Sequence, residues 1–274
     1  MAVVRRTYVE GPFGQVHVRT AGAKRDRPPL ICFHMSPMSG RVFEAFIAEM
    51  GEDRLAVAPD TPGFGMSDAP EQPPEIMDYA RAMAALVDAL DIDGPIDLMG
   101  YHTGTRIACE LARLRPQQVR RLVLVAAAIM TAEERDAQRK LYEPVKPSLD
   151  GTHLSNEWQS YVHFNLGRGL DLNAVADMFP EMLLGRDRAW YGHHAAFNHA
   201  LDQTLAALRQ PVMVINPADD LQLFTSRAAP LLSNGCVIDK PEWGHGFLDA
   251  STQDAARIVR AFLDSSDEAP FSGV

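Results

Sequence analysis

Runs of apolar residues recur along the chain and predict buried strands. The first long run, Pro28–His34, is bounded by turn residues, as is typical of a strand buried on both faces. Later runs of the same character are Arg54–Asp60, Ile96–His102, Val119–Ala128 and Pro211–Pro217. Two shorter β-rich runs, Thr7–Glu10 and Gln15–Thr20, come before them and flank a turn. The pattern predicts a sheet whose central strands are covered on both sides.

Helical spacing appears between several of these runs. Apolar residues recur at intervals of three and four from Ile76 to Leu90, and again from Ala255 to Phe262. Strands that alternate with helices favour a mostly parallel sheet with helices on both faces. After Ser265 the pattern ends, and we expect a loose tail.

The alternation stops after Ala128 and resumes at Pro211. From Thr131 to about Gln210 the pattern is helical and irregular, with no strong strand. The sheet would be incomplete without the strand that follows, so we interpret this stretch as an insertion into one core. The predicted division is a core of residues 1–128 and 210–274, with a helical insertion at residues 129–209.

Composition excludes some classes of partner. The 274 residues carry a net charge of −10 with no block of basic residues, which argues against nucleic acid as a partner. No run is long and apolar enough for a membrane span, and we see no signal peptide. Three cysteines with no close pairing argue against a disulfide framework. We expect a soluble cytoplasmic protein that acts on a small molecule, and a homodimer is left open.

Motifs of chemical interest occur in a fixed order, the first four at the ends of predicted strands and the last in a loop before the last helix. In chain order they are FHMSPMSG (33–40), APDTPGFGMSD (58–68), GYHTG (100–104), NPADDL (216–221) and EWGHGF (242–247). Together they resemble the α/β-hydrolase fold family over nearly all of Pro28–Phe262, apart from the insertion. The resemblance implies an α/β-hydrolase fold with a mostly parallel central sheet. It also implies that the insertion is a helical cap placed after the sixth core strand.

The GYHTG stretch matches the family's nucleophile elbow, a sharp turn from strand to helix. Such a turn forces its central residue into a strained backbone conformation that aims the side chain into the pocket. Neighbouring backbones then approach so closely that Gly100 and Gly104 are needed beside the turn. The family usually has Ser at the centre, whereas this chain has His102.

The resemblance also supplies a base and an acid. His245 lies between two glycines and matches the family's catalytic histidine, and Asp219 matches the acid that orients it. Asp220 is adjacent and could fill the same role. We favour Asp219, because Leu221 then takes the apolar position two residues later.

An oxyanion site is expected from two places. The first N–H of the helix after the elbow, that of Thr103, points at the pocket. The second donor would come from Ser36 or Met35, where Met35 departs from the glycine usual in the family. We expect His34 to brace this loop rather than to titrate in catalysis.

Three interpretations of His102 remain open: a nucleophile, a group that binds or polarises the substrate, or a residue of a site that has lost its chemistry. Our first hypothesis is a cofactor-free hydrolase of an ester, thioester, amide or activated C–C bond in a small, mainly apolar carbonyl compound. A lyase or other acid–base enzyme on the same fold is the nearest alternative. A non-catalytic protein that binds a small ligand is the third.

The insertion is rich in histidines and aromatic residues. Trp190–His199 is predicted to form a helix that places His194 and Asn198 on one face, one turn after Trp190. Trp158, Trp190 and His194 are candidates for a pocket under the cap. A metal site built from the histidines of the insertion is possible, but no motif such as H-E-x-x-H supports it. His102, His245 and Asp219 could in principle bind a metal, but the resemblance favours acid–base use, so we expect no metal and no cofactor.

Overall fold

An eight-stranded sheet forms the centre of the computed structural model, which describes residues 1–266. Nearly all of the expected loose tail lies outside these residues. The strands are β1 (Val4–Gly11), β2 (Gly14–Ala21), β3 (Leu30–Phe33), β4 (Ala56–Pro59), β5 (Ile96–Tyr101), β6 (Val119–Val125), β7 (Val212–Pro217) and β8 (Gly235–Lys240). Their order across the sheet is β1-β2-β4-β3-β5-β6-β7-β8. Strand β2 pairs in antiparallel fashion with both β1 and β4. All the other pairs are parallel, so the sheet is mostly parallel, as predicted.

Each central strand contributes to two hydrophobic cores, one on each face of the sheet. In β3, Ile31 belongs to one core and Cys32 to the other, and in β5 the same alternation separates Leu98 from Met99. Side chains of a strand point alternately to opposite faces, so both sets must be apolar where both faces are covered. This explains why each central strand appears in the sequence as a continuous apolar run.

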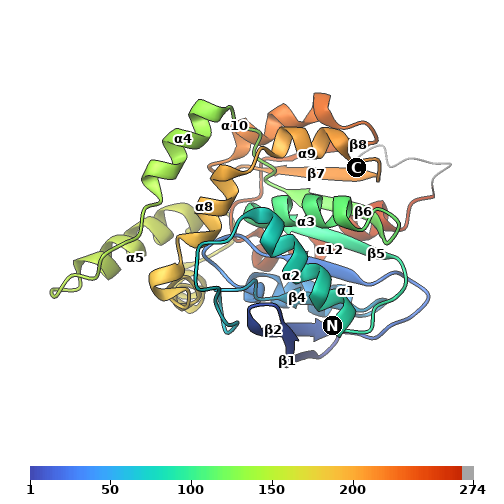
Figure 1. The fold of residues 1–274 in the computed structure, drawn as a ribbon, viewed down its shortest axis with the longest axis horizontal. Helices are drawn as coiled ribbons and strands as arrows, with labels where there is room; N and C mark the ends of the chain where they lie inside the picture. The colour runs from blue at the N-terminus through green and yellow to red at the C-terminus, as the bar shows by residue number, and fades with distance from the viewer. Residues whose placement is uncertain (267–274) are drawn as a thin grey trace.

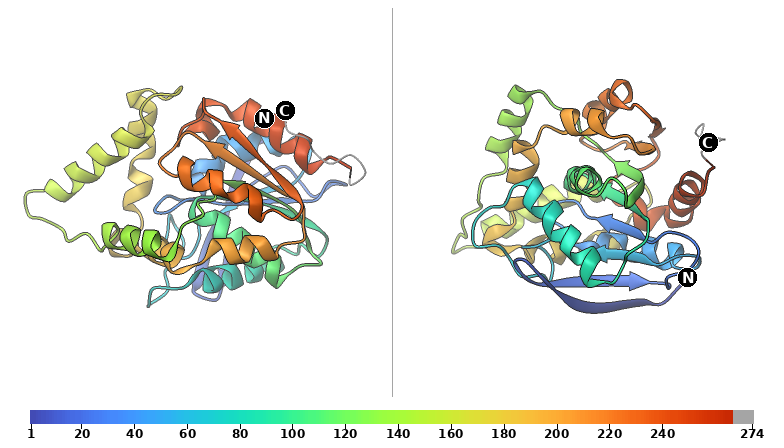
Figure 2. Two further views of the ribbon diagram at one scale, coloured as in Figure 1. Left: turned by 90° about the horizontal axis from the view of Figure 1, so that it is seen from above. Right: turned by 45° about the vertical axis from the view of Figure 1, so that its right-hand side comes forward.

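Helices cover both faces (Figures 1 and 2). One face packs against α2 (Ile76–Ala89), α3 (Thr103–Leu114) and α9 (Leu201–Ala207). The other packs against α1 (Glu44–Met50), α11 (Phe247–Ala250) and α12 (Thr252–Leu263). The remaining short core elements are η1 (Gly40–Phe43), α10 (Gln222–Thr225) and η3 (Ser226–Leu231). The helices predicted around residues 76–90 and 255–262 are therefore confirmed as α2 and α12.

The segment between β6 and β7 is helical, as expected. It contains α4 (Ala132–Leu141), α5 (Thr152–Asn165), α6 (Leu172–Met178), α7 (Pro180–Leu183), η2 (Arg186–Arg188) and α8 (Tyr191–Asn198) before α9. In Figure 2, α4 and α5 extend away from the sheet on one side of the molecule. We call residues 129–209 the insertion. Its helices arch over the ends of the parallel strands, where the predicted motifs lie (Figure 1).

Strand β8 is the element that the apolar pattern missed. It lies at the edge of the sheet, and only Ile238 within it is buried. An edge strand with one covered position has no continuous apolar run to detect. Among residues 1–266, no helix is both long and apolar enough to cross a membrane.

Candidate active site

His102 occupies a strained turn between β5 and α3. Its backbone has φ 48° and ψ −111°, a conformation that residues with a side chain rarely adopt. A Cβ on Gly100 would lie 2.3 Å from the Gly104 carbonyl oxygen, and one on Gly104 would lie 2.0 Å from the Phe33 carbonyl oxygen. The need for both glycines is thus confirmed, and the turn is intact around the imidazole.

The two histidines each face one of the two adjacent aspartates. His102 Nε2 lies 2.9 Å from Asp219 Oδ2, and His245 Nε2 lies 3.0 Å from Asp220 Oδ1. The expected pairing of Asp219 with His245 therefore differs from the structure, which gives His245 the alternative partner. The physical reason is the size of the elbow side chain, because an imidazole at position 102 reaches Asp219 and a serine hydroxyl would be shorter.

The ring of His245 is anchored on both nitrogens. Its Nδ1 lies 3.3 Å from the carbonyl oxygen of Phe164, which belongs to α5 of the insertion. Its backbone carbonyl accepts a hydrogen bond of 2.9 Å from the Tyr101 hydroxyl. The rings of His102 and His245 lie 5.3 Å apart between centroids. Sequence reasoning missed the Phe164 contact, since a backbone carbonyl carries no signal in the residue type.

The environment of the cluster shifts its ionisation. Burial works to lower the pKa of His245, but the hydrogen bond with Asp220 and the charges of both aspartates outweigh burial and raise it. Burial works to raise the pKa of Asp220, but the bond from His245 and the charge of His102 keep it below the ordinary value. The contact between Asp220 and His245 therefore favours the charged form of each group.

Asp219 is the most enclosed member of the cluster, with a side chain that is 0% exposed. Its Oδ1 accepts a hydrogen bond of 2.9 Å from the Leu221 N–H, which leaves Oδ2 for His102. The ligand atoms of His102, Asp219, Asp220 and His245 all lie within 4.8 Å of one another. These four residues are called the His/Asp cluster below.

The loop after β3 lies beside this cluster. His34 Nδ1 donates to the Met35 carbonyl at 2.9 Å, and its Nε2 accepts from the Thr61 N–H at 2.9 Å. Burial lowers the pKa of His34, so its neutral ring links two loops, in keeping with the bracing role expected for it. Met35 and Ser36 line the cavity above the cluster, and Thr103 is the first residue of α3. The N–H of Thr103 has no preceding helical turn to bond with.

A cavity of about 680 Å³ lies between the His/Asp cluster and the insertion. His102, Asp220 and His245 line it from the core side. Apolar and aromatic residues that line it from the insertion include Tyr142, Val145, Leu154, Phe164, Met182 and Trp190. A cavity of this size with a few convergent polar groups is typical of a small-molecule site.

Two of the three residues predicted for this pocket lie elsewhere. Trp158 packs edge-on against Phe179, with ring centroids 5.1 Å apart, inside the insertion. His194 lies on the predicted helix face with Asn198, at 3.1 Å, and outside the cavity. The neighbouring His193 lines the cavity instead, because the helix turns about 100° per residue. Burial and the nearby charge of His102 lower the pKa of His193 to about 3, so this ring is neutral.

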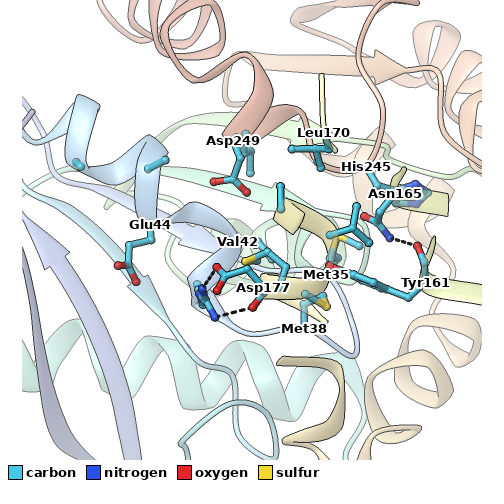
Figure 3. Close-up of a pocket in the computed structure, with 18 of the residues that line it drawn as sticks. Met35, Met38, Val42, Glu44, Tyr161, Asn165, Leu170, Asp177, His245 and Asp249 are labelled. Carbon is cyan, nitrogen blue, oxygen red and sulfur yellow. Dashed lines mark hydrogen bonds and ion pairs between the residues drawn. The ribbon is translucent and has the colours of Figure 1, made fainter. Parts of the chain in front are cut away.

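A second cavity of about 510 Å³ meets the first (Figure 3). Both are lined by Met35, Met38, Tyr161, Asn165 and His245. In Figure 3, His245 stands at one end of this second cavity and Glu44 at the other. His245 is therefore accessible from two sides.

Comparison with known proteins identifies the family. The family described as alpha/beta hydrolase fold matches residues 28–221. A bifunctional esterase/perhydrolase from Acinetobacter calcoaceticus is 24% identical over 258 residues, which covers 88% of this chain and 93% of that protein. A 2-hydroxy-6-oxo-2,4-heptadienoate hydrolase from Pseudomonas putida is 27% identical over 234 residues, or 80% of this chain and 82% of that protein.

A solved structure of similar fold is a hydrolase from Pseudomonas aeruginosa, with a TM-score of 0.80 and 17% identity. That match covers 95% of this chain and 99% of the other. The chain belongs to the α/β-hydrolase fold family. It is an enzyme of that family, of the hydrolase class.

Proposed function

We propose that the enzyme hydrolyses an ester, thioester, amide or activated C–C bond of a small, mainly apolar carbonyl compound, with water as the attacking nucleophile. The cavity over the His/Asp cluster supports this substrate class by its size and its largely apolar lining. The names of the two curated relatives, an esterase/perhydrolase and a hydrolase of an unsaturated oxo acid, support the reaction class.

The contact between His102 Nε2 and Asp219 is the observation that favours water, rather than the imidazole, as the nucleophile. Nε2 is the less hindered nitrogen of a histidine side chain, because Nδ1 lies next to the carbon that joins the ring to the backbone. Here Nε2 is held by a carboxylate at 2.9 Å. The nitrogen best suited to attack a carbonyl is thus occupied, and His102 is better placed to position and activate water.

The reaction then balances without a covalent intermediate. Water loses a proton to the His/Asp cluster as its oxygen bonds to the carbonyl carbon. The N–H of Thr103, with that of Met35 or Ser36, stabilises the resulting oxyanion. When the tetrahedral intermediate collapses, the bond to the leaving group breaks and the cluster returns the proton to it. The insertion covers the substrate, in the role of the family's cap.

Single-turnover hydrolysis of a panel of small acyl esters in ¹⁸O-labelled water tests this proposal. We expect one labelled oxygen in the acid product and no acyl mass on the peptide that contains His102. His102→Ala should lower kcat by about 10²- to 10⁴-fold. His194→Ala is the matched control, since this histidine lies outside the cavity, and it should keep wild-type rates.

A serine at the elbow gives a second test. His102→Ser restores the residue usual in the family, yet His245 offers Nε2 to Asp220 and Nδ1 to Phe164. We expect no acyl-serine in this variant, because no ring nitrogen of His245 is directed to the hydroxyl. An acyl adduct on wild-type His102 would overturn the water mechanism. Tight binding of the esters without turnover would make the protein a ligand-binding member of the fold.

A further inference from the structure

The His/Asp cluster combines two imidazoles and two carboxylates in one small volume. One ligand atom from each of His102, Asp219, Asp220 and His245 lies within 4.8 Å of all the others. Imidazole nitrogen and carboxylate oxygen are ligands that first-row divalent metal ions accept. We propose that these four side chains bind one divalent cation of the zinc type, at a site that neither the sequence motifs nor the names of the relatives assign.

The spacing of the four atoms suits such an ion. Metal–ligand bonds of about 2.1 Å in tetrahedral geometry place neighbouring ligand atoms about 3.4 Å apart. Within the cluster, the two His–Asp contacts measure 2.9 and 3.0 Å, and the other separations stay within 4.8 Å. These separations lie on both sides of the value that a tetrahedral ion requires.

Both histidines present the same ring nitrogen to the cluster. The Nε2 atoms of His102 and His245 face the carboxylates. On the far side of its ring, His245 contacts the Phe164 carbonyl through Nδ1. A carbonyl oxygen accepts only, so this contact places the proton on Nδ1 and leaves the Nε2 lone pair for a metal. Histidines that bind metals commonly donate their other N–H in this way.

Asp219 is oriented from behind in a similar manner. Its Oδ1 is held by the Leu221 N–H at 2.9 Å, so Oδ2 is the oxygen directed into the cluster. Carboxylate ligands are also usually fixed by a hydrogen bond outside the metal site. His102 is fixed by the elbow itself, whose backbone N–H donates to the Val125 carbonyl at 3.0 Å.

The charge of the His/Asp cluster is an independent reason to expect a bound cation. Two adjacent carboxylates meet here, one with a side chain that is 0% exposed and one that is 33% exposed. A histidine that binds a metal must be neutral at the binding nitrogen, so in the metal-bound state the two carboxylates need a counter-charge other than an imidazolium. A divalent ion supplies that charge at the centre of the four groups.

A bound ion would also explain the choice of residue at the elbow. His102, Asp220 and His245 line the substrate cavity, so the ion would face the substrate. If its coordination expanded to a fifth position facing the cavity, it would supply Lewis-acid chemistry to a water or a carbonyl there. This catalytic role rests on the proposed function, whereas binding of the ion does not. The inference replaces our sequence-based expectation of a site without metal.

Calorimetric titration of the chelator-treated enzyme with Zn²⁺, Mn²⁺ and Co²⁺ tests the site. We expect one ion per chain with a Kd of about 1 µM or tighter for Zn²⁺. Co²⁺ should show visible absorption bands of a site with nitrogen and oxygen ligands. Asp219→Asn and Asp220→Asn nearly keep side-chain shape and should weaken binding by at least about 100-fold.

His193→Gln is the matched control, because His193 lines the same cavity outside the cluster and should leave metal affinity unchanged. Circular dichroism of each variant separates loss of the site from loss of the fold. Absence of stoichiometric binding by the folded wild type would overturn the inference, as would unchanged affinity in both folded aspartate variants. If the ion binds but no ester is hydrolysed, the proposed function fails and the metal site stands. If the enzyme binds no ion and hydrolyses esters at the full rate without metal, the metal site fails and the proposed function stands.

Discussion

An imidazole at the elbow changes the contacts of every group around it. In the usual site of the family, the catalytic histidine turns one nitrogen toward a serine hydroxyl and the other toward an acid. Here the larger ring of His102 reaches Asp219 at 2.9 Å, and His245 pairs with Asp220 at 3.0 Å. In place of a chain of three groups, this site has two parallel His–Asp pairs.

The residues of this cluster follow from sequence, but their pairing does not. The motif pattern placed His102 and the two aspartates at strand ends and His245 in a loop before the last helix, and the structure brings the four together. Which aspartate meets which histidine depends on how the ring of His245 is turned. That orientation is set in part by the Phe164 carbonyl, about eighty positions earlier in the chain. A contact made by a backbone atom of the insertion leaves no trace in local sequence.

Asp60, in the second predicted motif, gives a prediction at the scale of one residue. Its carboxylate is 0% exposed and accepts bonds from Arg19 at 2.6 Å, from the Gly40 N–H at 2.9 Å and from the Met66 N–H at 2.9 Å. The His17 ring lies 2.9 Å from it. Burial works to raise the pKa of Asp60, but these partners outweigh burial and lower it.

Because the folded-state pKa of Asp60 is lowered, its stabilising effect is present above the unfolded-state pKa and is lost as pH falls through the folded one. Asp60→Asn should therefore lower the free energy of unfolding by about 3–5 kcal/mol at pH 7. The difference from wild type should narrow below about pH 4. Urea unfolding between pH 7 and pH 3 measures this difference in the free energy of unfolding, with the exposed Asp93→Asn as control. A difference that is equal or larger at pH 3 would contradict this account of Asp60.

At the scale of elements, how well the sequence predicts a strand or helix depends on how much of that element is buried. Strands β3, β5, β6 and β7 are buried along their whole length or nearly so, and the apolar runs located them to within a few residues. Helix α4 has no buried residue, so no apolar stripe marks it. Within the insertion, the helix predicted at Trp190–His199 is confirmed as α8 (Tyr191–Asn198), but the other helices could not be bounded. These helices reach the hydrophobic cores of the sheet through only a few residues, such as Tyr161 and Val175.

The close packing of α3 against β3 can be tested by adding one methyl group at Gly104. A Cβ on Gly104 would lie 2.0 Å from the Phe33 carbonyl oxygen, a backbone atom that cannot move aside cheaply. Gly104→Ala should therefore destabilise the fold by roughly 1–3 kcal/mol, although alanine is the better helix former. Gly94→Ala is the control, since no atom lies within 4 Å of the added Cβ. Urea unfolding compares the two, and a stabilised Gly104→Ala variant would show that the elbow does not hold the helix against the strand.

At the scale of the whole molecule, the insertion completes the site without belonging to the sheet. It supplies one wall of the cavity through residues such as Tyr142 and Trp190, and it supplies the Phe164 carbonyl behind His245. The chemistry at the strand ends therefore depends on how firmly the insertion is held to the core. Any motion of α5 relative to the core would release one nitrogen of His245.

Arg106 connects the two parts of the molecule. It lies on α3, is 2% exposed, and donates to the Ala196 carbonyl of α8 at 3.0 Å and to the Ala128 carbonyl after β6 at 3.2 Å. Burial lowers its pKa to about 10, which still leaves the guanidinium charged at neutral pH. One buried side chain of the core thus holds the helix that follows Trp190.

Arg106→Met keeps the length and apolar character of the side chain but removes both bonds. Two buried carbonyls then lose a donor, at a cost of roughly 1–3 kcal/mol each. We expect the insertion to loosen, so that limited proteolysis within residues 129–209 becomes faster and KM rises more than kcat falls. Arg81→Met, at an exposed position on α2, should change neither quantity. Proteolysis at the wild-type rate together with an unchanged KM would show that other contacts hold the insertion, and that Arg106 serves the stability of the core alone.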